Sequence, residues 1–121
     1  MTSFKILIIE DLEDIRQLFE LFLKKKGLET VSAANGIEGI EAAKNEKPDL
    51  ALIDIRLPDI NGFEVLRQIR DFNKTVKIFM LSGLYTEEQE QEALSAGATG
   101  FINKSEGIGA IVDKVALVLA S

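Results

Sequence analysis

Asp54 is the residue whose position most needs a chemical explanation. It lies in LALIDIRLP, residues 50–58, where its neighbours are mostly apolar and suit a buried strand. Burying an unpaired carboxylate costs several kcal/mol, so a chain rarely places one there without a purpose. Four more polar residues follow other apolar segments: Glu10, Asp11, Ser82 and Lys104. Together these groups could hold a cation and an anion side by side.

Segments typical of strands and of helices alternate along the whole chain. Strands are predicted over residues 5–9, 29–33, 51–55, 76–81 and 100–103. Helices are predicted over about residues 12–26, 37–45, 62–71, 86–97 and 106–119. Thr86, followed three residues later by Gln89, forms a capping-box signature for the fourth helix. The pattern is (βα)₅, which predicts an α/β protein.

Nearly unbroken apolar strands such as VKIFML, residues 76–81, are typical of parallel sheets that helices cover on both faces. Right-handed crossovers then predict an open, doubly wound sheet of five parallel strands. In such sheets, sites form outside the carboxyl ends of the strands, near the point where the strand order reverses. The five polar residues should therefore converge on one cleft.

Three carboxylates in one cleft repel one another unless a cation joins them. A few oxygen ligands with room for water suit Mg²⁺ better than Ca²⁺, and Lys104 suits a bound anion. Taken singly, each residue has an ordinary explanation: Asp11 could cap the first helix, Ser82 could be a loop residue, and Lys104 could be a solvated surface group. Their joint occurrence at four strand ends favours the functional interpretation.

The composition narrows the chemistry further. The chain of 121 residues fits one domain, and it contains no Cys and no His, which excludes disulfides, Cys/His zinc sites and His-dependent triads. The net charge of −6 argues against direct contact with nucleic acid. No apolar segment has the length of a signal peptide core or a membrane span, so we expect a cytoplasmic protein without membrane insertion.

Four motifs resemble a known family. IIED at 8–11, LIDIRLPDINGFE at 52–64, MLSG at 80–83 and GFINKS at 100–105 look like the successive motifs of the receiver domain of bacterial two-component response regulators. The resemblance covers essentially residues 1–121, which we expect to form a single receiver domain without an output domain. It implies a flavodoxin-like fold similar to that of the chemotaxis regulator, with strand order 2-1-3-4-5.

The resemblance also implies roles for the strand-end residues. Asp54 matches the phosphoacceptor aspartate. Glu10 and Asp11 match the acidic pair that, with Asp54 and the backbone carbonyl of Arg56, holds Mg²⁺. Mg²⁺ is thus the implied cofactor. Glu10 has a longer side chain than the Asp found at this position in relatives, and this length would suit a water-mediated contact with the ion.

Further positions match the family's switch. Ser82 matches the hydroxyl that contacts the phosphoryl group, Lys104 the lysine that pairs with it, and Phe101 the aromatic switch residue. Position 105 is Ser where many relatives have Pro, so we expect a trans Lys104–Ser105 bond or a slightly altered loop.

The implied function is a phosphorylation-activated signalling switch rather than an enzyme that acts on a separate substrate. A sensor histidine kinase or a histidine phosphotransfer protein would donate the phosphoryl group, since this chain has no His. Phosphorylation would change the face formed by the fourth helix, the fifth strand and the fifth helix. That face would contact a downstream effector or output domain, or a second copy in a phosphorylation-dependent homodimer.

Two other functions do not fit these residues. An aspartyl phosphatase would need an acid/base aspartate where Arg56 stands, and a flavodoxin would need a Ser-, Thr- and Gly-rich loop where EDLED stands. The alternative that stays open is a receiver-like module that binds a partner without being phosphorylated.

Overall fold

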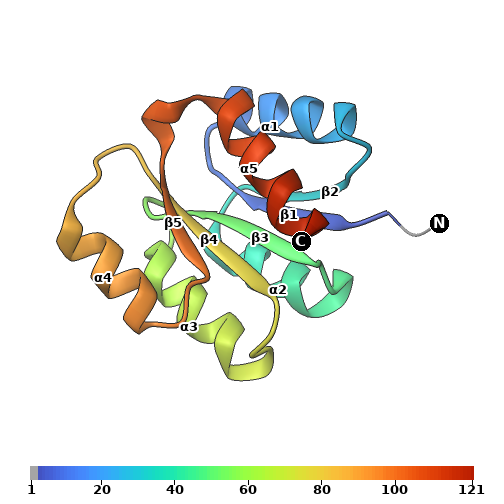
Figure 1. Cartoon of the computed structure of the whole chain (residues 1–121). Coiled ribbons are helices and arrows are strands. Elements are labelled where there is room, and N and C mark those ends of the chain that lie inside the picture. Colours follow the sequence, from blue (N-terminus) through green and yellow to red (C-terminus); the bar gives the residue numbers. More distant parts are fainter. Residues whose placement is uncertain (1–2) are drawn as a thin grey trace.

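Five parallel strands form one sheet in the computed structural model, which describes residues 3–121. The strand order is β2-β1-β3-β4-β5, which confirms the predicted flavodoxin-like topology (Figure 1). The elements are β1 (Lys5–Ile9), α1 (Glu13–Lys25), β2 (Glu29–Ala33), α2 (Gly36–Glu46), β3 (Leu50–Asp54), α3 (Gly62–Phe72), β4 (Lys77–Ser82), α4 (Glu87–Ser95), β5 (Gly100–Asn103), the short 3₁₀ helix η1 (Lys104–Glu106) and α5 (Ile108–Ala120).

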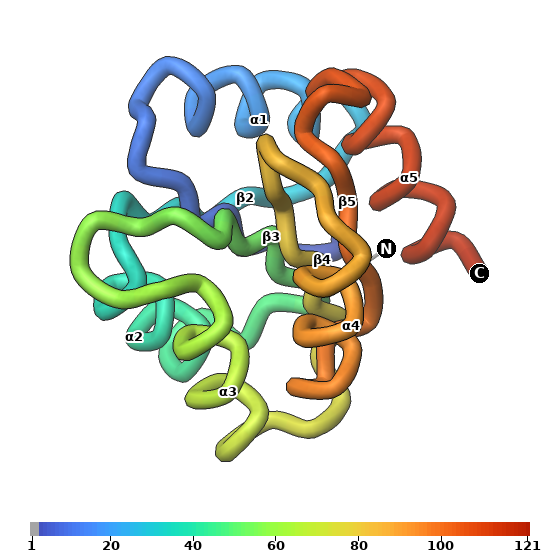
Figure 2. Tube along the Cα trace, turned by 90° about the vertical axis from the view of Figure 1, so that its left-hand side faces the viewer, coloured from blue at the N-terminus to red at the C-terminus, as the bar shows by residue number. Residues whose placement is uncertain are grey.

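The helices cover both faces of the sheet. Helices α1 and α5 lie on one face, and α2, α3 and α4 lie on the other (Figure 2). Successive residues of β1 point to opposite faces, so that Ile6 and Ile8 join the core beneath α1 and α5, while Leu7 and Ile9 join the other core. This double burial explains why the central strands are apolar on both sides. None of the helices over residues 3–121 combines the length and the apolar character needed to cross a membrane.

The predicted boundaries agree with the structure to within one or two residues, including the start of the last helix. We expected it to begin near Glu106, but η1 ends there and α5 begins at Ile108. Gly107 separates the two helices with φ of 93°, a conformation that L side chains rarely adopt. The Lys104–Ser105 bond is trans, as expected, since the described chain has no cis peptide bond.

The loop after β3 is anchored at two points. The N–H of Gly62 donates to the carbonyl of Ile55 at 2.8 Å, and a Cβ at position 62 would lie 2.8 Å from the Cα of Ile55. Asp59 accepts hydrogen bonds from the N–H groups of Gly36 and Ile37, both at 2.8 Å, at the first turn of α2. Tight packing and a helix N-terminus thus fix the loop that follows Asp54.

Candidate functional site

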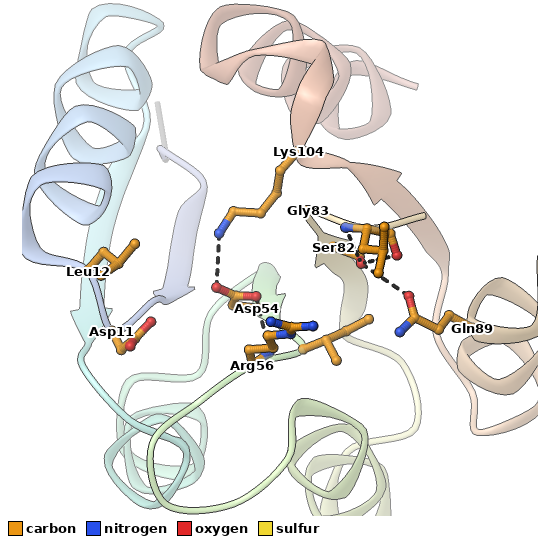
Figure 3. A pocket seen from close by; sticks show the side chains of 10 residues that line it. Asp11, Leu12, Asp54, Arg56, Ser82, Gly83, Gln89 and Lys104 are labelled. Carbon is orange, nitrogen blue, oxygen red and sulfur yellow. Dashed lines mark hydrogen bonds and ion pairs between the residues drawn. The ribbon is translucent and has the colours of Figure 1, made fainter. Parts of the chain in front are cut away.

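An open pocket of about 520 Å³ lies at the carboxyl ends of the central strands (Figure 3). The residues that line it are Asp11, Leu12, Asp54, Ile55, Arg56, Ser82, Gly83, Leu84, Gln89 and Lys104. Strand order reverses beside this edge, because β1 pairs with both β2 and β3. The pocket is therefore where the doubly wound topology predicts a site.

Asp54 is the last residue of β3, and only 6% of it is exposed. Both of its carboxylate oxygens have partners: Oδ1 accepts from the backbone N–H of Arg56 at 3.2 Å, and Oδ2 accepts from Nζ of Lys104 at 2.9 Å. The neighbouring apolar residues hold the backbone, while the side chain faces the pocket (Figure 3). The carboxylate is thus paired and oriented, as a buried charge must be.

Lys104 joins two carboxylates. It begins η1 directly after β5, and its Nζ lies 2.7 Å from Oε1 of Glu10 as well as 2.9 Å from Oδ2 of Asp54. Glu10 is fully buried, and its second oxygen accepts from the N–H of Leu12 at 3.2 Å. Both oxygens of Glu10 therefore already have donors, which the sequence did not reveal.

Burial and mutual hydrogen bonds act in opposite directions on the pKa values of this pair. Desolvation raises the pKa of Glu10, and the nearby Asp54 raises it further, against the opposing hydrogen bond from Lys104. Desolvation lowers the pKa of Lys104, but its hydrogen bonds to Glu10 and Asp54 outweigh this effect and raise it overall. Lys104 is therefore fixed as a cation at neutral pH, positioned next to Asp54.

Asp11 completes an acidic cluster. One oxygen from each of Glu10, Asp11 and Asp54 can be chosen so that all lie within 4.8 Å of one another. Three carboxylates against one ammonium leave two negative charges unbalanced, which favours a cation. Asp11 does not cap α1, because the N-cap residue is Leu12, with no side-chain cap. The capping explanation of Asp11 is therefore wrong, and its exposed carboxylate is free to bind a metal.

Ser82 reaches the same pocket, where its hydroxyl is bonded to the loop after β4 and to α4. Its Oγ lies 2.9 Å from the carbonyl oxygen of Leu84 and 3.1 Å from Oε1 of Gln89 on α4 (Figure 3). Phe101, on the neighbouring strand β5, is partly buried and meets the ring of Tyr85 edge to face at 5.5 Å. The structure thus places Ser82 in the pocket and Phe101 beside the loop that follows β4.

Two contacts of this region escaped the sequence interpretation. Gln89 was assigned only to the capping box, and no sequence signal showed that its side chain contacts Ser82. Asp59 has no role of its own in the sequence interpretation. A carboxylate near the start of one helix gives no sign that it binds the N-terminus of another. Burial raises the pKa of Asp59, but hydrogen bonds from the backbone of α2 and its own loop outweigh this and lower it.

Comparison with known proteins agrees with this geometry. The family model "Response regulator receiver domain" matches residues 6–116. Sporulation initiation phosphotransferase F of Bacillus subtilis is 30% identical over 115 residues, which cover 95% of this chain and 93% of that protein. The crystal structure of a CheY-like receiver domain protein from Methanospirillum hungatei superposes with a TM-score of 0.92 at 31% identity, covering 98% of this chain and 95% of that one.

Other relatives are longer. The chain spans only about half of several of them, among them the transcriptional regulatory protein YxdJ of Bacillus subtilis, which is 36% identical over 111 residues, or 92% of this chain and 48% of that protein. The fold and the acidic cleft define a flavodoxin-like domain with a site compatible with Mg²⁺. The chain belongs to the receiver domain family of two-component response regulators.

Proposed function

We propose that this receiver domain is a phosphorylation-activated switch, with Asp54 as the phosphoacceptor. One observation carries the proposal: a nearly buried carboxylate at the base of an open pocket, held by Lys104 on one oxygen and by a backbone N–H on the other. The relative named as a phosphotransferase supports transfer of a phosphoryl group as the chemistry. The donor is the phosphohistidine of a sensor kinase or a phosphotransfer protein, since this chain has no His.

In the transfer step, a carboxylate oxygen of Asp54 forms a bond to phosphorus while the bond between phosphorus and the donor's imidazole nitrogen breaks. Lys104 lies close enough to Asp54 to hold an oxygen of the incoming group, and Ser82 can turn its hydroxyl to another. Asp54 itself carries the phosphoryl group until hydrolysis restores the carboxylate, so the domain acts on itself and not as an enzyme with a separate substrate.

The acidic cluster fits Mg²⁺, because hard oxygen ligands lie close together and carry excess negative charge. Asp11 and Asp54 would hold the ion, with the backbone carbonyl of Arg56. Glu10, whose oxygens already have donors, would contact it through water. When bound, Mg²⁺ neutralises the phosphoryl oxygens and so lowers the electrostatic barrier to their approach.

We place the output on the face formed by α4, β5 and α5. The inner face of α5 is buried at Ile111, Val112 and Val115. Both charged residues of the helix form ion pairs, Asp113 with Lys26 and Lys114 with Glu106, and the rest of its outer face is largely apolar. Leu117 stands on that face with 70% of its surface exposed.

Ser82 and Phe101 would transmit the conformational effect of phosphorylation to this face. It replaces a singly charged carboxylate by an acyl phosphate with more charge and more acceptor oxygens, which draws the hydroxyl of Ser82 inward. Phe101 can then move into the space that is released, and it does so without burying a polar group, because it lacks the hydroxyl of Tyr. A downstream effector, an output domain or a second copy of this chain would sense the change. The cytoplasm is the compartment where we expect this to occur.

The proposal is tested by incubating the protein with acetyl phosphate and Mg²⁺ and measuring its intact mass. Wild type should gain one phosphoryl group, and Asp54→Asn should gain none while keeping its fold, because the shape is preserved and the nucleophile is lost. Asp71→Asn, an exposed change on α3, is the matched control and should behave as wild type. Phosphorylation of Asp54→Asn to the same extent would reject Asp54 as acceptor. No reaction of wild type would favour the module that works without phosphorylation.

The output face is tested by sedimentation with and without beryllofluoride and Mg²⁺, which mimic the acyl phosphate. If the face mediates a homodimer, wild type should associate on activation, and Leu117→Glu should prevent this. Ile37→Glu on α2, at an apolar residue that is 59% exposed and lies on the opposite face of the sheet, should not prevent it. A wild-type protein that stays monomeric would exclude the homodimer.

A further inference from the structure

The hydroxyl of Ser82 is held by three groups on its α4 side. Oγ accepts from the N–H of Leu84 at 3.1 Å, and its own proton can go to the carbonyl of Leu84 at 2.9 Å or to Oε1 of Gln89 at 3.1 Å. Ser82 is only 5% exposed, so these groups replace water as the hydrogen-bond partners of its hydroxyl. Any movement of this hydroxyl towards Asp54 must break them.

Gln89 takes part in a capping box that is only half formed. The hydroxyl of Thr86, the N-cap of α4, accepts from the N–H of Gln89 at 3.1 Å, as the sequence signature predicts. In a complete box, the side chain at position 89 would accept from the N–H of Thr86 in return. Here that side chain is bonded to Ser82 instead, and the Thr86 N–H donates to no group among residues 3–121.

Oε1 of Gln89 can therefore accept from either of two donors, the hydroxyl of Ser82 or the N–H of Thr86. The carboxamide of Gln89 lines the phosphorylation pocket while its backbone belongs to the first turn of α4 (Figure 3). If the Ser82 hydroxyl turned to a phosphoryl oxygen, Oε1 of Gln89 would lose the donor that it now shares with the carbonyl of Leu84. The unpaired N–H of Thr86, three residues earlier, could replace it at little cost in free energy, because one hydrogen bond replaces another.

We propose that Gln89 is a positioning residue that exchanges partners when the domain switches. In the resting state it holds the Ser82 hydroxyl away from Asp54. In the phosphorylated state it closes the capping box on Thr86, which fixes the first turn of α4. The inference rests on the proposed function of Asp54, and it supplies a direct route from the phosphorylation pocket to the output helix that does not involve Phe101.

The readout is solvent exchange of the Thr86 amide, measured by NMR. This amide should exchange about threefold to tenfold more slowly once it is bonded to Gln89, as expected for one neutral hydrogen bond. Beryllofluoride with Mg²⁺ should produce this slowing in wild type. Gln89→Met, which keeps the length of the side chain but lacks the amide oxygen, should still bind beryllofluoride and show no slowing at Thr86.

A second experiment uses the unphosphorylated protein and needs no beryllofluoride. Ser82→Ala removes the resting-state donor, so the Thr86 amide should already exchange slowly in the metal-free protein, and adding Gln89→Met should abolish that effect. Gln91→Met, an exposed change on the same helix, is the control and should leave exchange at Thr86 as in wild type. This experiment separates the two proposals, since it does not depend on phosphorylation.

The outcomes are distinct. If exchange at Thr86 is slow in Ser82→Ala and Gln89→Met abolishes this slowing, the exchange of partners is supported. This holds even if wild type fails to bind beryllofluoride, a result that would reject only the proposed function. Wild type that binds beryllofluoride without slowing at Thr86 overturns the inference and leaves the function intact. Unchanged exchange in Ser82→Ala overturns it as well.

Discussion

Replacing Asp11 by asparagine should make the metal-free domain more stable. Asp11 is exposed, and it shares the acidic cluster with Glu10 and Asp54, with candidate oxygens within 4.8 Å of one another. Two unit charges at 4.8 Å repel by about 0.9 kcal/mol in water and by about 3.5 kcal/mol at an effective dielectric constant of about 20. The positive charge of Lys104 offsets roughly one of the two repulsions that act on Asp11, those from Glu10 and from Asp54. Because Asp11 faces solvent, we expect a gain in the free energy of unfolding of about 1–2 kcal/mol.

Urea unfolding in EDTA measures this gain. For a domain of this size the denaturant slope is about 2 kcal/mol per molar, so the midpoint of Asp11→Asn should rise by about 0.5–1 M. Asp14→Asn is the matched control, since Asp14 lies in the first turn of α1 but outside the cluster. Its loss should leave stability unchanged or lower it slightly, because an acidic residue there favours the helix dipole. Added Mg²⁺ should stabilise wild type more than Asp11→Asn. A midpoint for Asp11→Asn at or below that of Asp14→Asn would refute the electrostatic argument.

Three further predictions concern the loops around the pocket. Arg56 and Leu84 both line the pocket, and Leu84 is 64% exposed. Replacing either residue by asparagine should speed loss of the phosphoryl group, because the amide would admit and orient water. An unchanged rate of dephosphorylation would exclude this role. Asp59 has a lowered pKa, so its stabilising contribution is present above its ordinary value of 3.8 and is lost as the pH falls through the lowered value. Asp59→Asn should therefore reduce the urea midpoint at neutral pH, and its difference from wild type should vanish in strong acid; a difference that persists there would contradict the assignment. Gly62→Ala should destabilise the domain by about 1–3 kcal/mol, because the new Cβ would lie 2.8 Å from the Cα of Ile55, and an unchanged thermal midpoint would show that the loop can relax.

The sequence alone was sufficient to place the pocket. Apolar periodicity located the strands, and the rule that parallel strands end at the same edge of a sheet brought Glu10, Asp11, Asp54, Ser82 and Lys104 together. This worked because burial on both faces leaves little freedom in a central strand: a polar residue that ends one must point into the cleft. The one- to two-residue accuracy of the boundaries follows from the same constraint, whereas the order of the strands is implied only by the resemblance to the receiver family.

Only the tertiary structure decided which polar group each side chain contacts. Lys104 pairs with Glu10 as well as Asp54, and Gln89 bonds to Ser82 instead of completing the cap that its spacing with Thr86 predicts. For Gln89, the local partner Thr86 competes with Ser82, and each neutral hydrogen bond contributes about 1 kcal/mol. For Lys104, both partners are distant in the chain and charged. Periodicity and local signatures describe the local partner alone. The distant partner, 94 residues away for Lys104 and Glu10, enters the competition only after the sheet has formed.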